Sequence, residues 1–259
     1  MKWIFSVLFV FIFSSTFFAN NLTGREIMEK ALNKTTWDYM QGKVELILIN
    51  SSNQKRIRKI IMYSRKRNKD ESDMLMKFIY PADVKNTAFL TIEHKNTDDD
   101  RYLYLPALRR VKRIASSGKG GNFMSSDFTY YDIGKPKLND WKYKRLEDEK
   151  VNGYDCYKIE CTPVDNSIME DTGYKKIIRW IRKDIFVTIK SLYYDTGNRE
   201  WKVLEVPEVK KIGNVWFQTD MIMKDLQTSH KSEMIFTGIE INKPVPEDFF
   251  SKRYLQRIH

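Results

Sequence analysis

The segment with the most evident binding chemistry is a run of basic residues that contains no acid. Five Lys or Arg residues fall between Arg109 and Lys119. Guanidinium groups bind phosphate and carboxylate through paired hydrogen bonds, and ammonium groups bind them as point charges. Two interpretations stay open. The run is a contact site for anionic head groups or an acidic partner, or it is a solvated strand and loop whose arginines pair with Asp127 and Asp132. The contact candidates are Arg109, Arg110, Lys112 and Arg113.

A second basic run extends from Lys55 to Lys69 and holds eight Lys or Arg residues without an acid. Ile57, Ile60 and Tyr63 are interleaved with these charges, a pattern typical of a strand with one polar face. We interpret this run as a solvated face, with contact to a membrane surface as the alternative.

Residues suited to catalysis are sparse. The chain has three His, at positions 94, 230 and 259, which leaves little material for a general base or a metal site. The loop Gly118–Gly121 resembles a phosphate-binding loop only superficially, because it lacks the full spacing and the following Ser or Thr. No nucleophile stands at a recognisable spacing from a base. We therefore expect no enzymatic activity, no cofactor and no metal.

Three consecutive Asp residues end the polar stretch Thr97–Asp100. A calcium-binding loop of the EF-hand kind needs ligands at alternating positions and a Gly at its turn. This stretch has neither feature, and we expect a solvated turn.

The two cysteines, Cys156 and Cys161, fall within one expected strand. In an extended chain their Cα atoms lie roughly 16 Å apart, at about 3.2–3.4 Å per residue. A disulfide tolerates a Cα separation of only about 4.4–6.8 Å. The odd spacing also directs the two side chains to opposite faces of a strand. We expect two free thiols.

The composition of the N-terminal residues predicts an export signal. Lys2 is the only charge among the first nineteen residues, the run Trp3–Phe13 is apolar at ten of eleven positions, and Ala19 follows a small-residue stretch. This order is typical of a secretory signal peptide, which we assign to residues 1–19. An uncleaved anchor is the alternative, because the apolar part reaches the lower limit of a membrane span, about 17–25 residues. Both readings place the rest of the chain outside the cytoplasm, and we expect it in the periplasm.

Length and charge narrow the classes of partner. The chain has 259 residues and a formal net charge of +11, or +10 without Lys2. Residues 20–259 are enough for one domain with a sizeable core. For an exported basic protein we expect transient contact with an anionic membrane surface and no binding of nucleic acid.

The residues after the leader predict one helix followed by many strands. Thr23 and Glu26 have capping-box spacing, which starts a helix over Thr23–Lys34. Val151-Asn152-Gly153 is a hairpin signal that requires positive φ angles. The expected strands, short and rich in Ile, Leu, Phe and Tyr, are Lys43–Asn50, Lys55–Arg65, Met74–Tyr80, Thr87–His94, Arg101–Leu105, Asp140–Lys150, Tyr154–Thr162, Tyr174–Lys183, Ile185–Asp195, Trp201–Lys211, Val215–Leu226 and Lys231–Ile241.

Strands of this spacing predict an antiparallel sheet or barrel with a hydrophobic concave face. Alternation predicts which side chains share a face. Ile185, Val187 and Ile189 lie opposite Thr188 and Lys190. In the strand Val215–Leu226, Val215, Phe217, Met221 and Met223 lie opposite Gln218, Asp220 and Lys224.

The stretch Tyr104–Ile133 resembles the signature of the bacterial outer membrane lipoprotein-sorting protein family of the LolA-like superfamily. The resemblance rests on Tyr-Leu-Pro-Ala-Leu-Arg-Arg-Val-Lys-Arg-Ile and Phe-Met-x-Ser-Asp-Phe-Thr-Tyr, with Asp127, Tyr130 and Asp132 as its structural residues. Tyr80–Thr87 and Pro246–Phe250 also resemble this family, so the similarity covers the chain after the leader. The sequence departs from the pattern at Asn86 and Ser125, where Gly is expected, and at Tyr131, where an acid is expected.

The resemblance implies a mainly β fold with short helices: a strongly curved, half-open antiparallel β-barrel whose helices plug a concave hydrophobic cavity. It implies a non-enzymatic periplasmic carrier that shields acyl chains of lipoproteins or lipids on the way to the outer membrane. An inner-membrane transporter and an outer-membrane acceptor are the implied partners. One alternative is an accessory subunit of a resistance-nodulation-division type lipid exporter, and a hydrolase acting on envelope lipids is a third, less favoured one.

A carrier needs an adaptable apolar wall, which Met and aromatic side chains provide. Filling of an ordinary core is the alternative role for each of these residues. If the carrier interpretation holds, one face of the basic strand around Arg110 should border the cavity mouth. The lipid-cavity candidates are Met74, Met76, Phe89, Met124, Phe217, Met221 and Met223, with Met234 also available.

Overall fold

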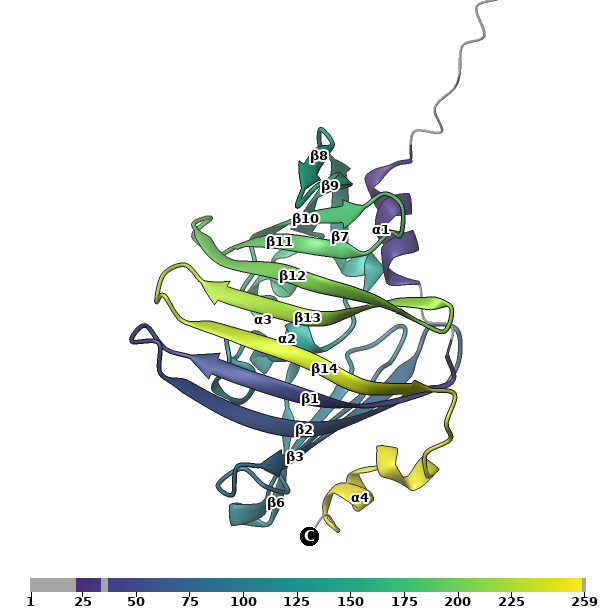
Figure 1. Ribbon diagram of the computed structural model, residues 1–259, viewed down its shortest axis with the longest axis vertical. Coiled ribbons are helices and arrows are strands. Elements are labelled where there is room, and N and C mark those ends of the chain that lie inside the picture. The colour runs from purple at the N-terminus through teal and green to yellow at the C-terminus, as the bar shows by residue number, and fades with distance from the viewer. Residues whose placement is uncertain (1–21, 34–36, 258–259) are drawn as a thin grey trace, which may run out of the picture.

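The computed structural model describes residues 22–33 and 37–257, and the expected signal peptide over residues 1–19 lies outside the described residues. Mainly β structure was expected and is confirmed (Figure 1). The described strands are β1 (Tyr39–Ile49), β2 (Lys55–Lys66), β3 (Ser72–Tyr80), β4 (Ala88–Ile92), β5 (Asp100–Leu105), β6 (Arg110–Ile114), β7 (Trp141–Arg145), β8 (Glu149–Val151), β9 (Tyr154–Pro163), β10 (Lys176–Arg182), β11 (Thr188–Tyr194), β12 (Glu200–Ile212), β13 (Val215–Asp225) and β14 (Lys231–Ile241).

These strands form one antiparallel sheet in the order β6-β5-β4-β3-β2-β1-β14-β13-β12-β11-β10-β9-β7, with β8 paired to β9. The sheet curves strongly but does not close, because β6 and β7 end the order and do not pair with each other (Figure 1). The expected half-open antiparallel architecture is therefore confirmed. β1 and β14, which are far apart in sequence, pair along their length and join the two halves.

Local sequence signals explain the boundaries of several elements. Thr23 caps helix α1 (Gly24–Leu32), and its capping box with Glu26 is present as expected. The hairpin between β8 and β9 turns at Asn152 and Gly153, whose φ angles of 51° and 83° fit the mirror-image turn that this pair favours. α1 lies against β7, and Gly24 is needed there because a Cβ would come within 3.0 Å of the Arg145 backbone nitrogen.

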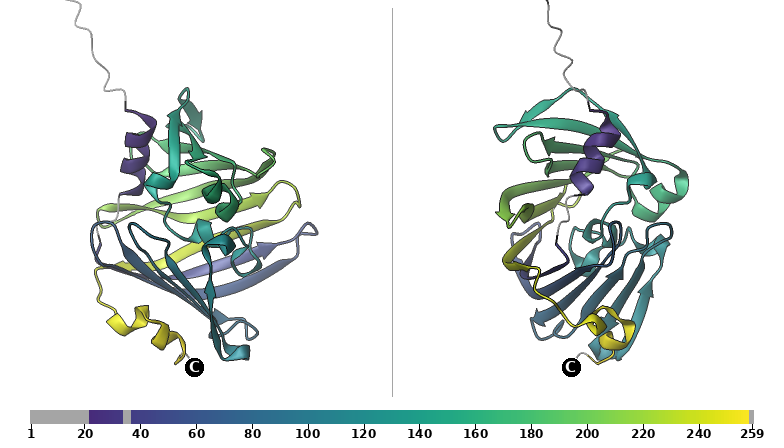
Figure 2. Two further views of the ribbon diagram at one scale, coloured as in Figure 1. Left: turned by 180° about the vertical axis from the view of Figure 1, so that it is seen from behind. Right: turned by 90° about the vertical axis from the view of Figure 1, so that its right-hand side faces the viewer.

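The hollow of the sheet is filled by residues 115–140, which we call the plug segment (Figure 2). It contains three short 3₁₀ turns, η2 (Ser116–Gly118), η3 (Phe123–Ser125) and η4 (Leu138–Asp140), and helix α2 (Tyr130–Ile133). Phe123, Phe128 and Tyr131 of this segment are buried in the main hydrophobic core, together with α1 and the concave residues of most strands. The plug segment is thus held by the core rather than laid on its surface.

The convex side of β3–β5 carries a second, smaller core. The C-terminal turns η5 (Glu247–Phe250) and α4 (Lys252–Leu255) cover it, so that Phe250 and Leu255 pack against Leu75 and Leu90. Both faces of this half of the sheet are therefore buried, and Figure 1 shows α4 below β1 and β2, next to the C-terminus.

Short helices were expected from the family resemblance and are present, but the residue pattern did not locate α2, α3 (Asn166–Thr172) or α4. α2 has four residues, α3 has seven and α4 has four, so none completes the periodic apolar stripe by which a helix is recognised. Each begins with a side-chain cap, from Thr129, Asp165 and Ser251. The expected strand Asp140–Lys150 is also divided, because the chain turns between β7 and β8.

The expectation of a solvated turn at Thr97–Asp100 is wrong for its central residue. The Asp99 side chain is only 2 % exposed and forms ion pairs with Arg101 at 2.7 Å and with Lys137 at 3.0 Å. Lys137 belongs to the plug segment, whereas Arg101 belongs to β5. The buried carboxylate therefore ties the plug to the sheet, a role that a run of like charges in the sequence does not indicate.

Both cysteines are free and buried in β9, as expected from their spacing. Burial raises the pKa of each thiol, Cys156 and Cys161, to about 11. At pH 8 only on the order of 0.1 % of each would be the reactive thiolate. We predict very slow alkylation by iodoacetamide in the folded protein and two fast-reacting thiols in urea. Rapid labelling of folded protein at pH 8 would contradict this prediction.

Candidate functional site

A cavity of about 380 Å³ lies between the concave face of the sheet, the plug segment and the end of α1. This volume is at the lower end of the usual range for small-molecule sites, about 300–1,000 Å³. Seven of the eleven Met residues line it, with Trp37, Phe128, Phe217 and Phe236 among its aromatic residues. The seven are Met40, Met62, Met74, Met76, Met221, Met223 and Met234. Such a wall adapts to apolar ligands of variable shape.

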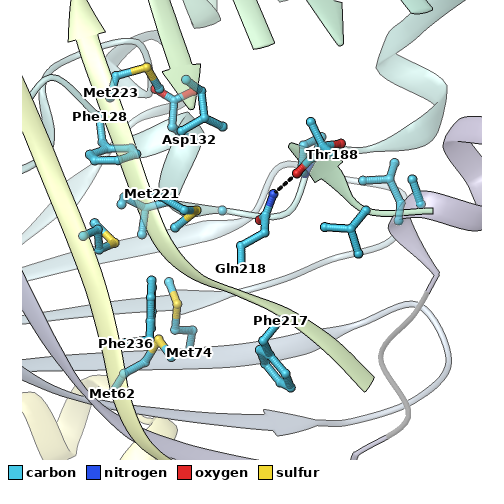
Figure 3. A pocket seen from close by; sticks show the side chains of 18 of the residues that line it. Met62, Met74, Phe128, Asp132, Thr188, Phe217, Gln218, Met221, Met223 and Phe236 are labelled. Atoms are coloured by element: carbon cyan, nitrogen blue, oxygen red, sulfur yellow. Dashed lines mark hydrogen bonds between the residues drawn. The ribbon is translucent and has the colours of Figure 1, made fainter. Parts of the chain in front are cut away.

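The structure brings together five of the seven lipid-cavity candidates. Met74, Met76, Phe217, Met221 and Met223 line the cavity, and Figure 3 shows Met74, Phe217, Met221 and Met223 around one space. They come from β3 and β13, which lie on the two halves of the sheet. Met234 of β14, opposite Met221, lines it as well.

Phe89 and Met124 lie elsewhere. Phe89 is fully buried and packs against the plug segment. Its ring centroid lies 5.3 Å from those of Phe123 and Tyr130. The backbone oxygen of Met124 accepts a hydrogen bond from the Arg58 guanidinium of β2. Both residues therefore hold the plug, and neither lines the described cavity.

Strict alternation fails for β13. Gln218 was expected on the face opposite Phe217, yet both line the cavity. The register of β12 against β13 shifts on either side of Glu208, next to Pro207, which has no N–H to donate. These bulges rotate the strand, and the Gln218 side-chain amide donates a 2.6 Å hydrogen bond to the Thr188 carbonyl of β11 (Figure 3). This hydrogen bond links β13 to the start of β11 across β12 at the cavity wall.

The three residues of the family-like signature anchor the plug segment. Asp127 is buried, and its carboxylate accepts a 2.6 Å hydrogen bond from the Ser232 hydroxyl of β14. Burial raises the pKa of Asp127 above its usual range. Asp132 completes the capping box of α2 with Thr129 and accepts a 2.8 Å hydrogen bond from the Tyr174 hydroxyl. Tyr130 packs on Phe89 and Phe123.

Two positions where the family pattern expects Gly hold other residues in a left-handed conformation. Asn86 has φ = 67° and Ser125 has φ = 60°. Glycine adopts this conformation without steric cost, which explains the expectation of Gly there. The departures from the pattern therefore leave the local backbone geometry in place.

The basic segment lies at one edge of the sheet, away from the cavity. Arg109 closes the turn η1 (Pro106–Leu108) in a left-handed conformation, so strand alternation begins only at Arg110. Arg110, Lys112 and Arg113 are exposed on β6, and Arg113 pairs with Asp100 at 2.8 Å. The expectations that one face of this strand borders the cavity and that its arginines pair with Asp127 or Asp132 are both wrong.

The edge strand β6 carries exposed cations. Cations on an edge strand discourage pairing with a second sheet. Leu108, next to Arg109 in the chain, is 62 % exposed, and Tyr80 at the end of β3 is 52 % exposed. The second basic run, on β2, is also largely solvated at its start, except that Arg58 turns inward to the plug.

Sequence reasoning missed two inward-facing cations. Lys202 of β12 is 1 % exposed, and its ammonium donates to the Asp127 carbonyl at 2.8 Å and lies over the Trp201 ring. Burial lowers its pKa. Arg179 of β10 lines the cavity. Alternation could have found both, because Lys202 is in phase with the buried Leu204, and Arg179 with Ile177 and Ile181.

None of the described helices is long and apolar enough to cross a membrane.

Known proteins share this architecture. A family model described as an uncharacterized protein matches residues 70–257. A structure assigned as an outer membrane lipoprotein-sorting protein domain from Vibrio parahaemolyticus has 32 % identity and a TM-score of 0.84, covering 90 % of this chain and 98 % of that one. A DUF1329 family protein from Desulfovibrio piger has 25 % identity and a TM-score of 0.84, covering 90 % and 97 %. A LolA superfamily protein from Nitrosomonas europaea has 20 % identity and a TM-score of 0.70, covering 90 % and 99 %. No curated protein matches the chain significantly.

Proposed function

Because this chain belongs to the outer membrane lipoprotein-sorting protein family of the LolA-like superfamily, we propose that it is a non-enzymatic periplasmic carrier of acyl chains. The carrier takes up the lipid part of a lipoprotein or a free lipid at the inner membrane. It shields that part in the Met-lined cavity and releases it toward the outer membrane.

The observation that carries the proposal is the Met-lined cavity of about 380 Å³ on the concave face. An acyl chain that crosses an aqueous gap needs shielding worth about 0.8 kcal/mol per buried CH₂ group. Apolar side chains from both halves of the sheet supply such a surface, and the plug segment covers it.

The direct test is the analysis of natural cargo. The protein is purified from its own periplasm without detergent, extracted with organic solvent, and the extract is analysed by mass spectrometry. We expect an acyl lipid or a lipoprotein in near-stoichiometric amount. Protein that carries no acyl compound and takes none up from vesicles would refute the carrier and favour an accessory subunit of a lipid exporter.

The basic edge strand supports docking of this carrier on an anionic membrane surface. We predict that the double substitution Arg110→Glu and Lys112→Glu weakens binding to anionic vesicles at low salt by about 30-fold or more. Each charge near such a surface contributes about 1 kcal/mol. Co-sedimentation measures the loss, which should shrink at physiological salt as screening increases.

The matched control reverses two exposed lysines, Lys142 and Lys144, on β7 at the opposite edge of the sheet. It changes the net charge equally and should weaken vesicle binding much less. Equal losses in the two double variants would mean that only net charge matters and that β6 is no docking surface.

A further inference from the structure

Arg179 occupies a position where the sheet pattern calls for an apolar residue. It lies on the concave face in phase with Ile177 and Ile181, and its cross-strand neighbours are Ile159 of β9 and Ser191 of β11. All four neighbours are buried. The side chain lines the cavity together with the Met residues.

The guanidinium has no carboxylate partner within 4.0 Å among the described residues. It donates a long hydrogen bond of 3.5 Å to the Ser191 hydroxyl, and the neutral side chains of Tyr193 and Cys161 also lie in hydrogen-bond contact with it. The other groups around it are the uncharged Tyr131 and Tyr143. Arg101 and Arg65, which are largely buried, instead pair with Asp99 and Asp73 at 2.7 and 2.8 Å. Arg179 is half-buried, and a cation enclosed to this extent without a counter-charge is costly and calls for a reason.

The other charges at the cavity have partners. Asp132 lines it too, but its carboxylate already accepts hydrogen bonds from the Thr129 backbone, the Thr129 hydroxyl and Tyr174. Lys202, which is buried nearby but does not line the cavity, donates to the Asp127 carbonyl. Arg179 therefore contacts only neutral groups at an apolar cavity, and the three of them, Ser191, Tyr193 and Cys161, are fewer than the five N–H groups that a guanidinium carries.

We propose that Arg179 binds the anionic group of the cargo, a carboxylate or a phosphate, inside the cavity. The proposal rests on the proposed carrier function and narrows it. An amphiphile enters with its acyl chain along the Met residues and its anionic group on the guanidinium, which can form two parallel hydrogen bonds to it. The preferred cargo is then a free acidic lipid, and a lipid anchor without a charge is a poorer ligand.

The test compares three ligands of equal chain length: hexadecanoate, hexadecyl phosphate and hexadecanol. Each displaces a fluorescent acyl probe from delipidated full-length protein. We expect at least one anion to bind about 10- to 100-fold more tightly than the alcohol, the effect of a charge-assisted hydrogen bond. The anion that binds more tightly shows whether the anionic group of the cargo is a carboxylate or a phosphate.

Substitutions then assign the effect to Arg179. Arg179→Gln should lower anion affinity to that of hexadecanol and leave hexadecanol binding unchanged, whereas Arg179→Lys should keep part of the preference. The control Arg253→Gln removes one exposed charge on α4 and should keep the full preference for the anions over hexadecanol. Arg179→Met should unfold no earlier than the wild type, because no carboxylate loses its partner.

The inference is wrong if the wild type binds the alcohol as tightly as both anions, or if Arg179→Gln keeps the preference. If Arg179→Gln does not fold, the affinities of the wild type and of Arg179→Lys for the two anions and for hexadecanol test the inference instead. A preference for an anion in the wild type that is smaller in Arg179→Lys supports it, and an equal preference in both contradicts it. If none of the three ligands binds, the carrier function itself fails, which separates that outcome from failure of this inference alone.

Discussion

Replacing Asp99 by Ala is expected to destabilise the protein by about 3–5 kcal/mol, the usual cost of breaking a buried ion pair from one side. The substitution leaves Arg101, whose side chain is 5 % exposed, without its counter-charge, and Lys137 loses a partner as well. The measurement is the free energy of unfolding from urea titration, followed by far-ultraviolet circular dichroism.

Asp98 provides a matched control one residue away. Its side chain is exposed, so Asp98→Ala should cost no more than about 1 kcal/mol. The double substitution Asp99→Ala and Arg101→Met should recover much of the lost stability, because the buried cation is then removed too. Equal effects of Asp98→Ala and Asp99→Ala would show that Asp99 does not hold the plug segment to the sheet.

Replacing Met221 by Trp should reduce affinity for an acyl ligand by about 100-fold. Met221 lines the cavity opposite Met234, and an indole there occupies space that the ligand needs. Exclusion of about four CH₂ groups removes about 3 kcal/mol at 0.8 kcal/mol each, which corresponds to this factor. Displacement of a fluorescent fatty acid measures the change.

The neighbouring Ile222 serves as the control, because it lies outside the cavity on the same strand. Ile222→Trp should bind the ligand as the wild type does, and both variants should keep cooperative thermal unfolding. If Met221→Trp binds the fatty acid normally, acyl chains do not occupy the described cavity.

The sheet could be predicted from the sequence because each strand carries its own signal. Apolar alternation and turn residues such as Asn152 act locally, and they located nearly every strand of the sheet within a few residues. Helix α1 was predicted from its capping box for the same reason. The resemblance in Tyr104–Ile133 supplied what local signals lack, namely that the sheet stays half open around a plug.

The parts that were missed depend on contacts between distant segments. The sequence predicts that Asp99 is one of three solvated acids. Lys137 comes into contact with Asp99 only in the folded chain. Gln218 faces the cavity because β12 and β13 slip in register, which alternation on one strand does not reveal. Phe89 is as apolar as the cavity residues, but the plug covers it. The type of a residue predicts that its side chain is buried. It does not predict whether that side chain lines the cavity or packs against the plug segment.

The methionine lining has a chemical consequence of its own. Oxidation adds an oxygen atom to a thioether and turns a flexible apolar side chain into a polar sulfoxide. Seven such groups surround one small space, so a few oxidation events would make the wall polar while the strand pairing and the aromatic core under the plug stay intact. If the proposed carrier function holds, affinity for an acyl ligand would fall as these methionines are oxidised and would recover when methionine sulfoxide reductase reduces them.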